Sequence, residues 1–590
     1  MRVKIKDCGK GVNKDLLPSE LLPGQWSDSL NMRARNGFAQ KRKGVKAAYT
    51  TPAVVPYWIH TYVTATARFV LEAGIAKVYA DDGTTQTEIT RYTDGVEISS
   101  STNSTTTATV NTATAHGRTT GQTITRYGAF PAAYNGTFVI TVSDADTFTY
   151  TMLSDPGGSA TIQGNYSYNV QSDFTGAIDD KWTGGVFNGV GVLNNPVDGP
   201  YYWNGDVTTR LRRFPGWPAG QKCDALVIFK NYLIALAPTI NGVKQRQLVL
   251  WCKAAEPGSM PTEWTATATN DAGDTPQAAA RGGSLVDGRP LGDTLAIYGQ
   301  DGRFALSYIG GNSVFRMSSL PGSDGLLARG CIAETPKGHV FLSNGDVKIH
   351  NGGEAVSICE GRIRKWLFNT MDSTNAQRSF LAVNAQTKEV WVVFPSYGQA
   401  TCDTVAAWNW EDDTWGIFSV SSVTHGTSGL IATGLNADTW ASDTDSWDSD
   451  GSTWKENEYS QNEARLILAT STPRIGLAET GTTDFGTSVS WLLEKVGISL
   501  EDSDSVKVFS ASRPQIDALA GTQFSVAHGS AKTADGAPTY SAPVTFTVGT
   551  TDWANRFANG GKYLAIKMYG SNDQPIAMKT YDIDFTVQGR

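Results

Sequence analysis

Residues 339–350 read HVFLSNGDVKIH, and this pattern decides the fold. Two short runs with β-branched and aromatic residues flank the turn sequence SNGD at 343–346, which is typical of a β-hairpin. Further turn sequences of this kind are DDG at 81–83, NGD at 204–206 and QDG at 300–302, each between runs of the same character. Long apolar segments with helical spacing are nearly absent. The chain is therefore predicted to be all-β.

A succession of small hairpins without a strict period favours a β-propeller, because each blade is a small antiparallel sheet that buries its faces against its neighbours. An array of β-sandwiches is the alternative. We expect a β-propeller-like core over residues 51–94 and 169–438. The Ser- and Thr-rich stretch 95–168 interrupts this core, but strand-like alternation at 137–142 and 147–152 predicts an inserted small β-module rather than a disordered linker.

Two further segments follow the core. Residues 439–457 form an acidic linker rich in Trp, Asp and Ser, and residues 458–590 are predicted to form a C-terminal β-sandwich-like domain. Carboxylates like those of the linker suit calcium, but an EF-hand loop would need Asp in place of Ser446 and Glu in place of Asn457. We expect a solvated linker without a metal. Its aspartates are Asp443, Asp445, Asp448 and Asp450.

The first fifty residues differ in charge from the rest of the chain. They contain eleven Lys and Arg and four Asp and Glu, a net of +7, whereas the whole chain carries −8 and the remaining 540 residues therefore carry −15. Pro18 and Pro23 interrupt the leucine pairs of this segment and prevent a long helix. We expect a basic extended segment at 1–50 that docks on its own domain or on a partner. The candidate partner-docking residues are Trp26, Arg33, Arg35, Lys41, Arg42 and Lys43.

Composition also narrows the function classes. No run of 18 apolar residues exists, so we expect no membrane-spanning segment, and the charged start lacks the apolar region of a signal peptide. An acidic chain is a poor general binder of nucleic acid, but it lets DNA pass through a lumen without adhering. Six scattered cysteines predict reduced, buried thiols made in a cytoplasm rather than a disulfide framework.

Motifs for catalysis are missing from the sequence. It has no GxSxG elbow, no Walker loop, no HExxH and no CxxC pair, so we expect no enzyme, no catalytic residues, no metal and no cofactor. His116 has no potential metal ligand close in sequence and is expected to serve a turn. His339 and His350 are expected to be ordinary strand residues.

A Trp-rich stretch is the strongest candidate for ligand binding. Sugars stack on aromatic faces and glycosidases use two carboxylates, so three Trp residues beside two Asp residues permit a glycan site. Strand alternation places two of the Trp residues on one face, which favours a core or inter-blade pair instead. The residues concerned are Trp408, Trp410, Asp412, Asp413 and Trp415.

The sequence GRIRKWLFNTMD at 361–372 is the best helix candidate in the core. Arg362, Arg364 and Lys365 crowd its start, opposite to the preference of the helix dipole. They form either a basic patch that meets a neighbouring subunit or a solvated face.

Three regions share the character of one known family. Residues 13–37 read NKDLLPSELLPGQWSDSLNMRARNG, residues 405–418 read VAAWNWEDDTWGIF, and residues 490–509 read SWLLEKVGISLEDSDSVKVF and are followed by the strand-rich stretch 560–590. In this order they resemble the tail nozzle (tail tubular or tail stabilisation) proteins of short-tailed, podovirus-like bacteriophages. The inserted module at 95–168 departs from a minimal form of that family.

The resemblance implies a structural protein of the virion tail, assembled in the host cytoplasm. Such a nozzle is a ring of six copies at the distal end of the tail. It docks to the tail adaptor ring, carries fibres, spikes or a needle, and forms the channel through which viral double-stranded DNA is ejected; the channel-lining residues are not readable from the sequence. Our hypothesis is that the basic segment meets an acidic surface of a neighbour or of the adaptor, so that deleting residues 1–45 abolishes tail assembly and leaves the propeller folded. The alternative function is a glycan-binding or glycan-cleaving β-propeller that acts as a receptor-binding tail protein.

Overall fold

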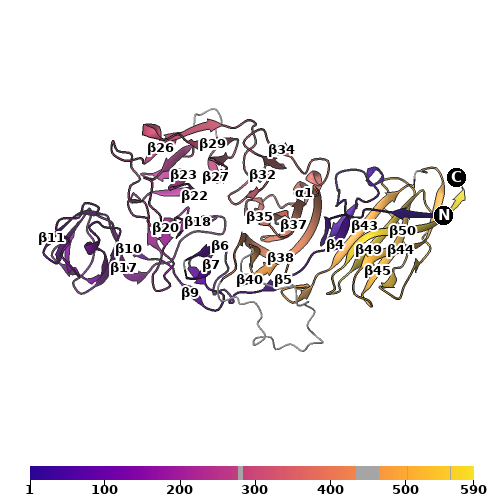
Figure 1. Cartoon of the computed structure of the whole chain (residues 1–590), viewed down its shortest axis with the longest axis horizontal. Helices are drawn as coiled ribbons and strands as arrows, with labels where there is room; N and C mark the ends of the chain where they lie inside the picture. The colour runs from indigo at the N-terminus through magenta and orange to yellow at the C-terminus, as the bar shows by residue number, and fades with distance from the viewer. Residues whose placement is uncertain are drawn as a thin grey trace.

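The computed structural model describes seven stretches of the chain, residues 1–64, 66–218, 220–276, 283–432, 464–500, 502–558 and 560–589. They confirm the all-β fold class. Figure 1 shows an elongated molecule in which three β-rich parts lie in a row. The inserted module lies at one end, a ring of small antiparallel sheets lies in the middle, and a β-sandwich that holds both chain ends lies at the other end.

The ring begins with five separate sheets, each built mainly from strands that follow one another in the chain. We number the ring sheets in chain order. The first contains β6 (Trp58–Val63), β7 (Arg68–Ala73), β8 (Val78–Asp81) and β9 (Gln86–Glu88), and the second contains β18 (Thr183–Phe187), β19 (Val190–Asn195), β20 (Gly199–Trp203) and β21 (Arg212–Arg213). The third contains β22 (Lys222–Phe229), β23 (Tyr232–Ile240), β24 (Val243–Lys244), β25 (Leu248–Trp251) and β26 (Gly273–Pro276). The fourth contains β27 (Leu285–Leu291), β28 (Thr294–Gly299), β29 (Arg303–Tyr308) and β30 (Phe315–Ser319), and the fifth contains β31 (Ile332–Thr335), β32 (Gly338–Ser343), β33 (Asp346–His350) and β34 (Val356–Ser357).

The remaining two ring sheets share one long strand. The sixth contains β35 (Phe380–Asn384), β36 (Glu389–Phe394), β37 (Cys402–Asn409) and the first half of β38 (Thr414–Gly429). The seventh contains the second half of β38, then β39 (Arg465–Thr470), β40 (Arg474–Ala478) and β5 (Val45–Ala47), with β41 (Thr483–Asp484) and β42 (Thr487–Ser488) at its edge. A buried cluster of Ile59, Val70, Ile467 and Ile475 joins the seventh sheet to the first and closes the ring. This arrangement is a β-propeller-like core.

The hairpin turns explain why these sheets form. Ser343 and Asp346 face each other across β32 and β33, so Asn344 and Gly345 make the turn between them. Gly345 has a φ of +91°, a conformation that costs little only for glycine. The turn sequence SNGD at 343–346 therefore sets the register of the fifth sheet.

The C-terminal part is a sandwich of two sheets. One sheet contains β2 (Asp28–Leu30), β43 (Trp491–Ile498), β49 (Tyr563–Gly570), β45 (Gln523–Ala531), β46 (Thr539–Tyr540) and β47 (Val544–Thr547). The other contains β1 (Arg2–Ile5), β50 (Ala577–Gly589), β44 (Val506–Asp517), β48 (Ala554–Asn555) and β4 (Phe38–Lys41), and β4 continues through β3 (Met32–Arg35) to β38 of the ring. Trp26, Phe509, Ile566 and Tyr581 are among the buried side chains between the two sheets.

The N-terminal segment is therefore part of both larger units. Its strands pair with β50, β43, β38 and β40, all of which lie in the second half of the chain. The sequence predicts that residues 1–50 form an extended segment docked on its own domain or on a partner. In the structure this segment contributes the strands β1 to β5 to sheets of its own chain. The sequence also placed the C-terminal domain at 458–590, whereas residues 465–488 complete the seventh ring sheet and the sandwich strands resume at Trp491.

The inserted module has two four-stranded sheets. They contain β10 (Tyr92–Asp94), β17 (Asn165–Gln171), β13 (Thr123–Tyr127) and β14 (Gly136–Val139), and β11 (Ile98–Ser104), β12 (Thr107–Thr112), β16 (Thr147–Thr151) and β15 (Thr141–Val142). A core that includes Val110, Phe148 and Tyr166 lies between them. The module thus spans residues 92–171, three residues more at each end than the sequence indicated. The acidic linker at 439–457 and its carboxylates lie outside the described residues.

Candidate functional site

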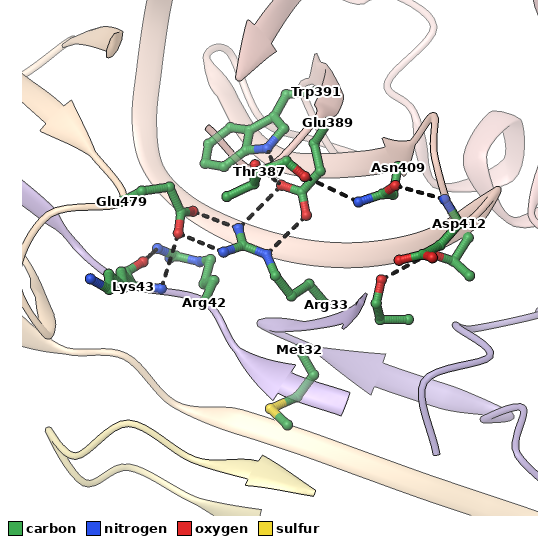
Figure 2. Close-up of polar contacts among 12 residues, drawn as sticks. Met32, Arg33, Arg42, Lys43, Thr387, Glu389, Trp391, Asn409, Asp412 and Glu479 are labelled. Carbon is green, nitrogen blue, oxygen red and sulfur yellow. Dashed lines mark hydrogen bonds and ion pairs between the residues drawn. The ribbon is translucent and has the colours of Figure 1, made fainter. Parts of the chain in front are cut away.

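Arg33 lies where the ring meets the sandwich. It is on β3, which pairs with β4 of the sandwich and with β38 of the ring. Its guanidinium binds two carboxylates: Nε and Nη2 donate to Glu389 at 2.9 and 3.1 Å, and Nη1 and Nη2 donate to Glu479, each at 2.6 Å. Figure 2 shows the guanidinium between the two carboxylates. Glu389 begins β36 of the sixth ring sheet and Glu479 follows β40 of the seventh, so one side chain joins three elements.

All three charged side chains are buried, with 7% of Arg33, 2% of Glu389 and 6% of Glu479 exposed. Burial alone would lower the pKa of Arg33, but attraction by Glu389 and Glu479 outweighs it and raises this pKa. Glu389 also accepts hydrogen bonds from the Thr387 hydroxyl at 2.9 Å and the Trp391 indole at 3.1 Å. The carboxylate is thereby held in one orientation, as a buried ion pair requires.

Arg42 makes a second buried connection to the ring. Its Nη1 donates to the Asp484 carboxylate at 2.9 Å, its Nη2 to the Ser419 carbonyl oxygen at 2.7 Å and its Nε to the Asn31 side chain at 2.9 Å. Asp484 lies on β41 and Ser419 on β38. We call Arg33, Arg42, Glu389, Glu479 and Asp484 the junction cluster.

Two further candidates from the N-terminal segment are buried on the sandwich side. Trp26 is 2% exposed, and its indole nitrogen donates to the Cys8 carbonyl oxygen at 2.8 Å. The Lys41 ammonium donates to the carbonyl oxygen of Asn572, and burial lowers the pKa of Lys41. Both side chains therefore stabilise the contact of residues 1–45 with the C-terminal sheets.

These contacts correct the docking hypothesis for four residues. Trp26, Arg33, Lys41 and Arg42 are buried in their own chain and present no free face to a partner, because their charges and hydrogen-bonding groups are engaged internally. Arg35 is half-buried and Lys43 is exposed. A contact of these two residues with a partner stays a prediction.

The predicted helix is present as α1 (Arg364–Thr370), and the N-terminal segment binds its start. The Asp15 carboxylate accepts the backbone N–H groups of Lys365 at 3.0 Å and Trp366 at 3.4 Å. It supplies the negative charge that this helix end favours and that the helix's own sequence lacks.

The basic residues around α1 divide into two groups. Arg362 donates to the Asp413 carboxylate at 2.7 Å, and Arg364 donates to the Gly345 carbonyl oxygen at 2.8 Å. Lys365 is exposed. A basic patch that meets another subunit therefore rests mainly on Lys365 and stays a prediction.

The Trp-rich stretch lies in the ring core. Trp408 and Trp415 are opposite each other on β37 and β38, with 3% and 2% of their surfaces exposed. Trp410 is 7% exposed. Asp413 accepts from the Trp408 indole at 2.9 Å as well as from Arg362, and Asp412 accepts from the Asn36 backbone N–H at 3.1 Å. These indoles are structural and do not form a sugar-stacking surface.

His116, His339 and His350 are also buried. His339 and His350 face each other on β32 and β33, and the Tyr298 hydroxyl lies between them at 2.9 and 2.7 Å from their ring nitrogens. Burial lowers the pKa of His339 to about 4 and that of His350 to about 3, so both are neutral at pH 7. His116 accepts the Arg118 backbone N–H at 3.0 Å within a turn of the module.

The described part of the chain also bears on thiols, metal sites and membrane-spanning helices. All six cysteines lie in the described part of the chain and are buried free thiols, as predicted in place of a disulfide framework. The described residues contain no group of three or more His, Cys, Asp or Glu that could hold a metal ion. They also contain no helix long and apolar enough to cross a membrane.

No local sequence signal marks the partners of the junction cluster. Glu389 and Glu479 lie 356 and 446 positions from Arg33, and Asp484 lies 442 positions from Arg42. Nothing in the charge of a residue reveals whether its partner is solvent, its own chain or another protein.

Comparisons with known proteins give weak similarities. No protein-family model matches this chain, and no curated protein matches it. The similar solved structures include PorZ, a surface component of the type-IX secretion system of Porphyromonas gingivalis, with 9% identity, a TM-score of 0.27 and coverage of 87% of this chain and 46% of PorZ. They also include the WD40 domain of Neurospora crassa Pan2, with 7% identity, a TM-score of 0.28 and coverage of 67% and 90% of the two chains. For the phage phi92 endosialidase, the identity is 12%, the TM-score 0.17 and the coverage 57% and 52%. Because all three similarities are low, the fold assignment rests on the observed sheets.

Proposed function

We propose that this protein is a non-enzymatic structural subunit of a virion, the tail nozzle of a short-tailed bacteriophage. The proposal rests on the positions of the three regions that resemble nozzle proteins, 13–37, 405–418 and 490–509. Residues 13–37 contain β2 and β3, residues 405–418 span the β37–β38 hairpin, and residues 490–509 contain β43. β2 pairs with β43 and β3 pairs with β38, so regions far apart in sequence meet at one junction.

This junction suits a subunit that works mechanically. The junction cluster and the shared strands connect the ring to the sandwich through buried ion pairs and continuous sheet. Subunits that close a ring through head-to-tail contacts need a fixed angle between their two contact surfaces. In the proposal, six copies form the nozzle, dock to the adaptor ring, carry fibres, spikes or a needle, and let double-stranded DNA pass.

The net charge fits the passage of DNA. Each chain carries −8, so six copies carry −48. Like charge between the channel wall and DNA prevents adhesion. The alternative is a glycan-binding or glycan-cleaving propeller. The Trp-rich stretch does not support it, because the indoles of Trp408, Trp410 and Trp415 are buried.

Labelled virions test this proposal. A short peptide tag inserted between Gly157 and Gly158 marks the module, since a Cβ atom built at either position has no atom within 4 Å outside its chain neighbours. A tag after Gly242, which is equally open, marks the ring and serves as the matched control. We expect both labels at the distal end of the tail with sixfold symmetry, at two different radii in electron microscopy.

Labels on fibres or spikes would contradict the nozzle and favour the glycan-binding alternative. Absence of both labels from virions would contradict a virion role altogether. Monomers of the purified protein would decide nothing, because ring closure in the proposal takes place on the adaptor.

A further inference from the structure

A cavity of about 250 Å³ lies at one end of the ring axis. Its lining comes from five successive ring sheets, mostly at or just before the first strand of each, and Lys244 of β24 and Gln300 after β28 complete it. First strands of several neighbouring sheets contact one another. The lining includes Lys181, Asp224, Ser284, Arg329 and Gln377. We call this cavity the axial mouth.

Lys181 crosses the axial mouth. It precedes β18 of the second sheet, yet its ammonium donates to the carbonyl oxygen of Arg329 at 2.9 Å and to that of Ser379 at 2.6 Å. Arg329 precedes the fifth sheet and Ser379 precedes the sixth, on the other side of the ring. The Arg329 guanidinium in turn donates to the carbonyl oxygen of Asp224. Both cations are thus bound to neutral oxygens.

The carboxylates of the axial mouth are engaged by other cations. Asp179 binds Arg378, with 2.8 Å between Oδ1 and Nε, and Asp224 binds Lys244, with 2.6 Å between Oδ2 and Nζ. Within the described residues, Lys181 and Arg329 form no ion pair. Lys181 and Arg329 therefore have no ion-pair partner there, although the Asp179 and Asp287 carboxylates attract Lys181 from a longer distance. Burial lowers the pKa of Lys181, as expected for a cation held away from bulk water.

Another cation from the first strands of the ring adds positive potential near Lys181. Arg289 of β27 lies near His60 of β6 and His425 of β38. Burial and this arginine lower the pKa of His60 to about 4, and burial with Lys181 lowers that of His425 to about 3, so neither imidazole is charged at pH 7. Asp287 opposes this potential, but both of its oxygens accept backbone N–H groups, at 2.8 and 2.9 Å.

We propose that the axial mouth binds one small oxyanion between Lys181 and Arg329. An ammonium has three N–H donors and a guanidinium five, and the described contacts use two of the first and one of the second. The spare donors suit an oxyanion, which a guanidinium binds with paired hydrogen bonds. Since a water occupies roughly 30 Å³ of liquid, the cavity has room for the anion and several waters. This site is independent of the proposed nozzle function.

Anion titrations of purified protein test the site. The melting temperature and the heat of binding are measured with inorganic phosphate, sulfate and acetate against sodium chloride of equal ionic strength. Arg329→Gln removes one cation from a half-buried position, Lys181→Met removes the other, and Lys365→Gln removes an exposed charge elsewhere as the matched control. We expect saturable stabilisation of the wild type and of Lys365→Gln, an affinity at least about tenfold lower in Arg329→Gln, and no binding by Lys181→Met.

A stronger response to phosphate and sulfate would identify a tetrahedral anion, and a stronger response to acetate would identify a carboxylate. If none of the three anions binds the wild type saturably, the site does not exist as proposed. Equal affinities of wild type and Arg329→Gln would also overturn it, and this comparison decides the matter even if Lys181→Met fails to fold.

Discussion

An Arg33→Met variant tests how firmly the N-terminal segment is held between ring and sandwich. Methionine keeps much of the side-chain volume but removes four charged hydrogen bonds, two to Glu389 and two to Glu479. The two carboxylates, at most 6% exposed, then share a buried site without a counter-charge. Breaking a buried ion pair in this way costs about 3–5 kcal/mol.

Native-state hydrogen exchange measures the loss of stability at the strands that Arg33 connects. A multidomain chain does not unfold in one step, so amide exchange in β3, β36 and β40 is more informative than a global transition. The expected loss corresponds to exchange roughly 150- to 5,000-fold faster at β3. Arg35→Met is the matched control, because Arg35 lies on the same strand and is half-buried; its expected effect is below about 1 kcal/mol.

A triple variant separates charge from packing. Arg33→Met combined with Glu389→Gln and Glu479→Gln leaves no uncompensated charge, and it should recover most of the stability lost by the single variant. The reasoning is refuted if Arg33→Met exchanges at β3 as slowly as Arg35→Met. It is also refuted if the triple variant is no more stable than the single one.

Three further predictions concern a buried carboxyl, the buried thiols and the N-terminal strands. Burial and the adjacent Asp81 raise the pKa of the Glu72 carboxyl from 4.5 to about 8. The folded protein therefore keeps a proton that the unfolded chain releases, and the free energy of unfolding should fall as pH rises from about 4.5 to about 8. Urea unfolding at both ends of this range should show a smaller loss in Glu72→Gln than in the wild type, and equal losses would contradict the raised pKa. Burial raises the pKa of all six thiols, that of Cys331 to about 11. A thiol reagent should therefore modify them far more slowly in the native protein than in urea. A native thiol that is modified rapidly would contradict this burial. Deletion of residues 1–45 removes β1 to β4 and Arg33. Circular dichroism and limited proteolysis should then show loss of the folded sandwich. An intact sandwich would contradict the pairing of β1 with β50 and of β2 with β43.

Local features of the fold were predictable from the sequence, because they depend on neighbouring residues. The hairpin around Asn344 and Gly345, the helix near Arg364 and the paired Trp408 and Trp415 all follow from alternation and turn chemistry within a few positions. The buried state of the indoles follows from the same alternation.

Features that depend on distant pairing were not predictable in this way. The basic composition of the first fifty residues predicted a segment that docks on its own domain or on a partner, without deciding between them. Arg33 and Arg42 are buried with carboxylates more than 350 positions away. The division of β38 between two sheets and the entry of β5 into the seventh sheet likewise depend on pairings that no local pattern encodes.

The pairing of the first strands with the last ones has a consequence for biosynthesis. About 430 residues separate β5 from its neighbour β40, and at roughly 5–20 residues per second the ribosome takes about 20 to 90 seconds to make them. Throughout this time β1, β2 and β5 lack the strands with which they pair in the folded chain, and Trp26 lacks Tyr581. The nascent segment must then either be shielded by chaperones or risk aggregation, and the seventh sheet closes only after nearly the whole polypeptide has left the exit tunnel.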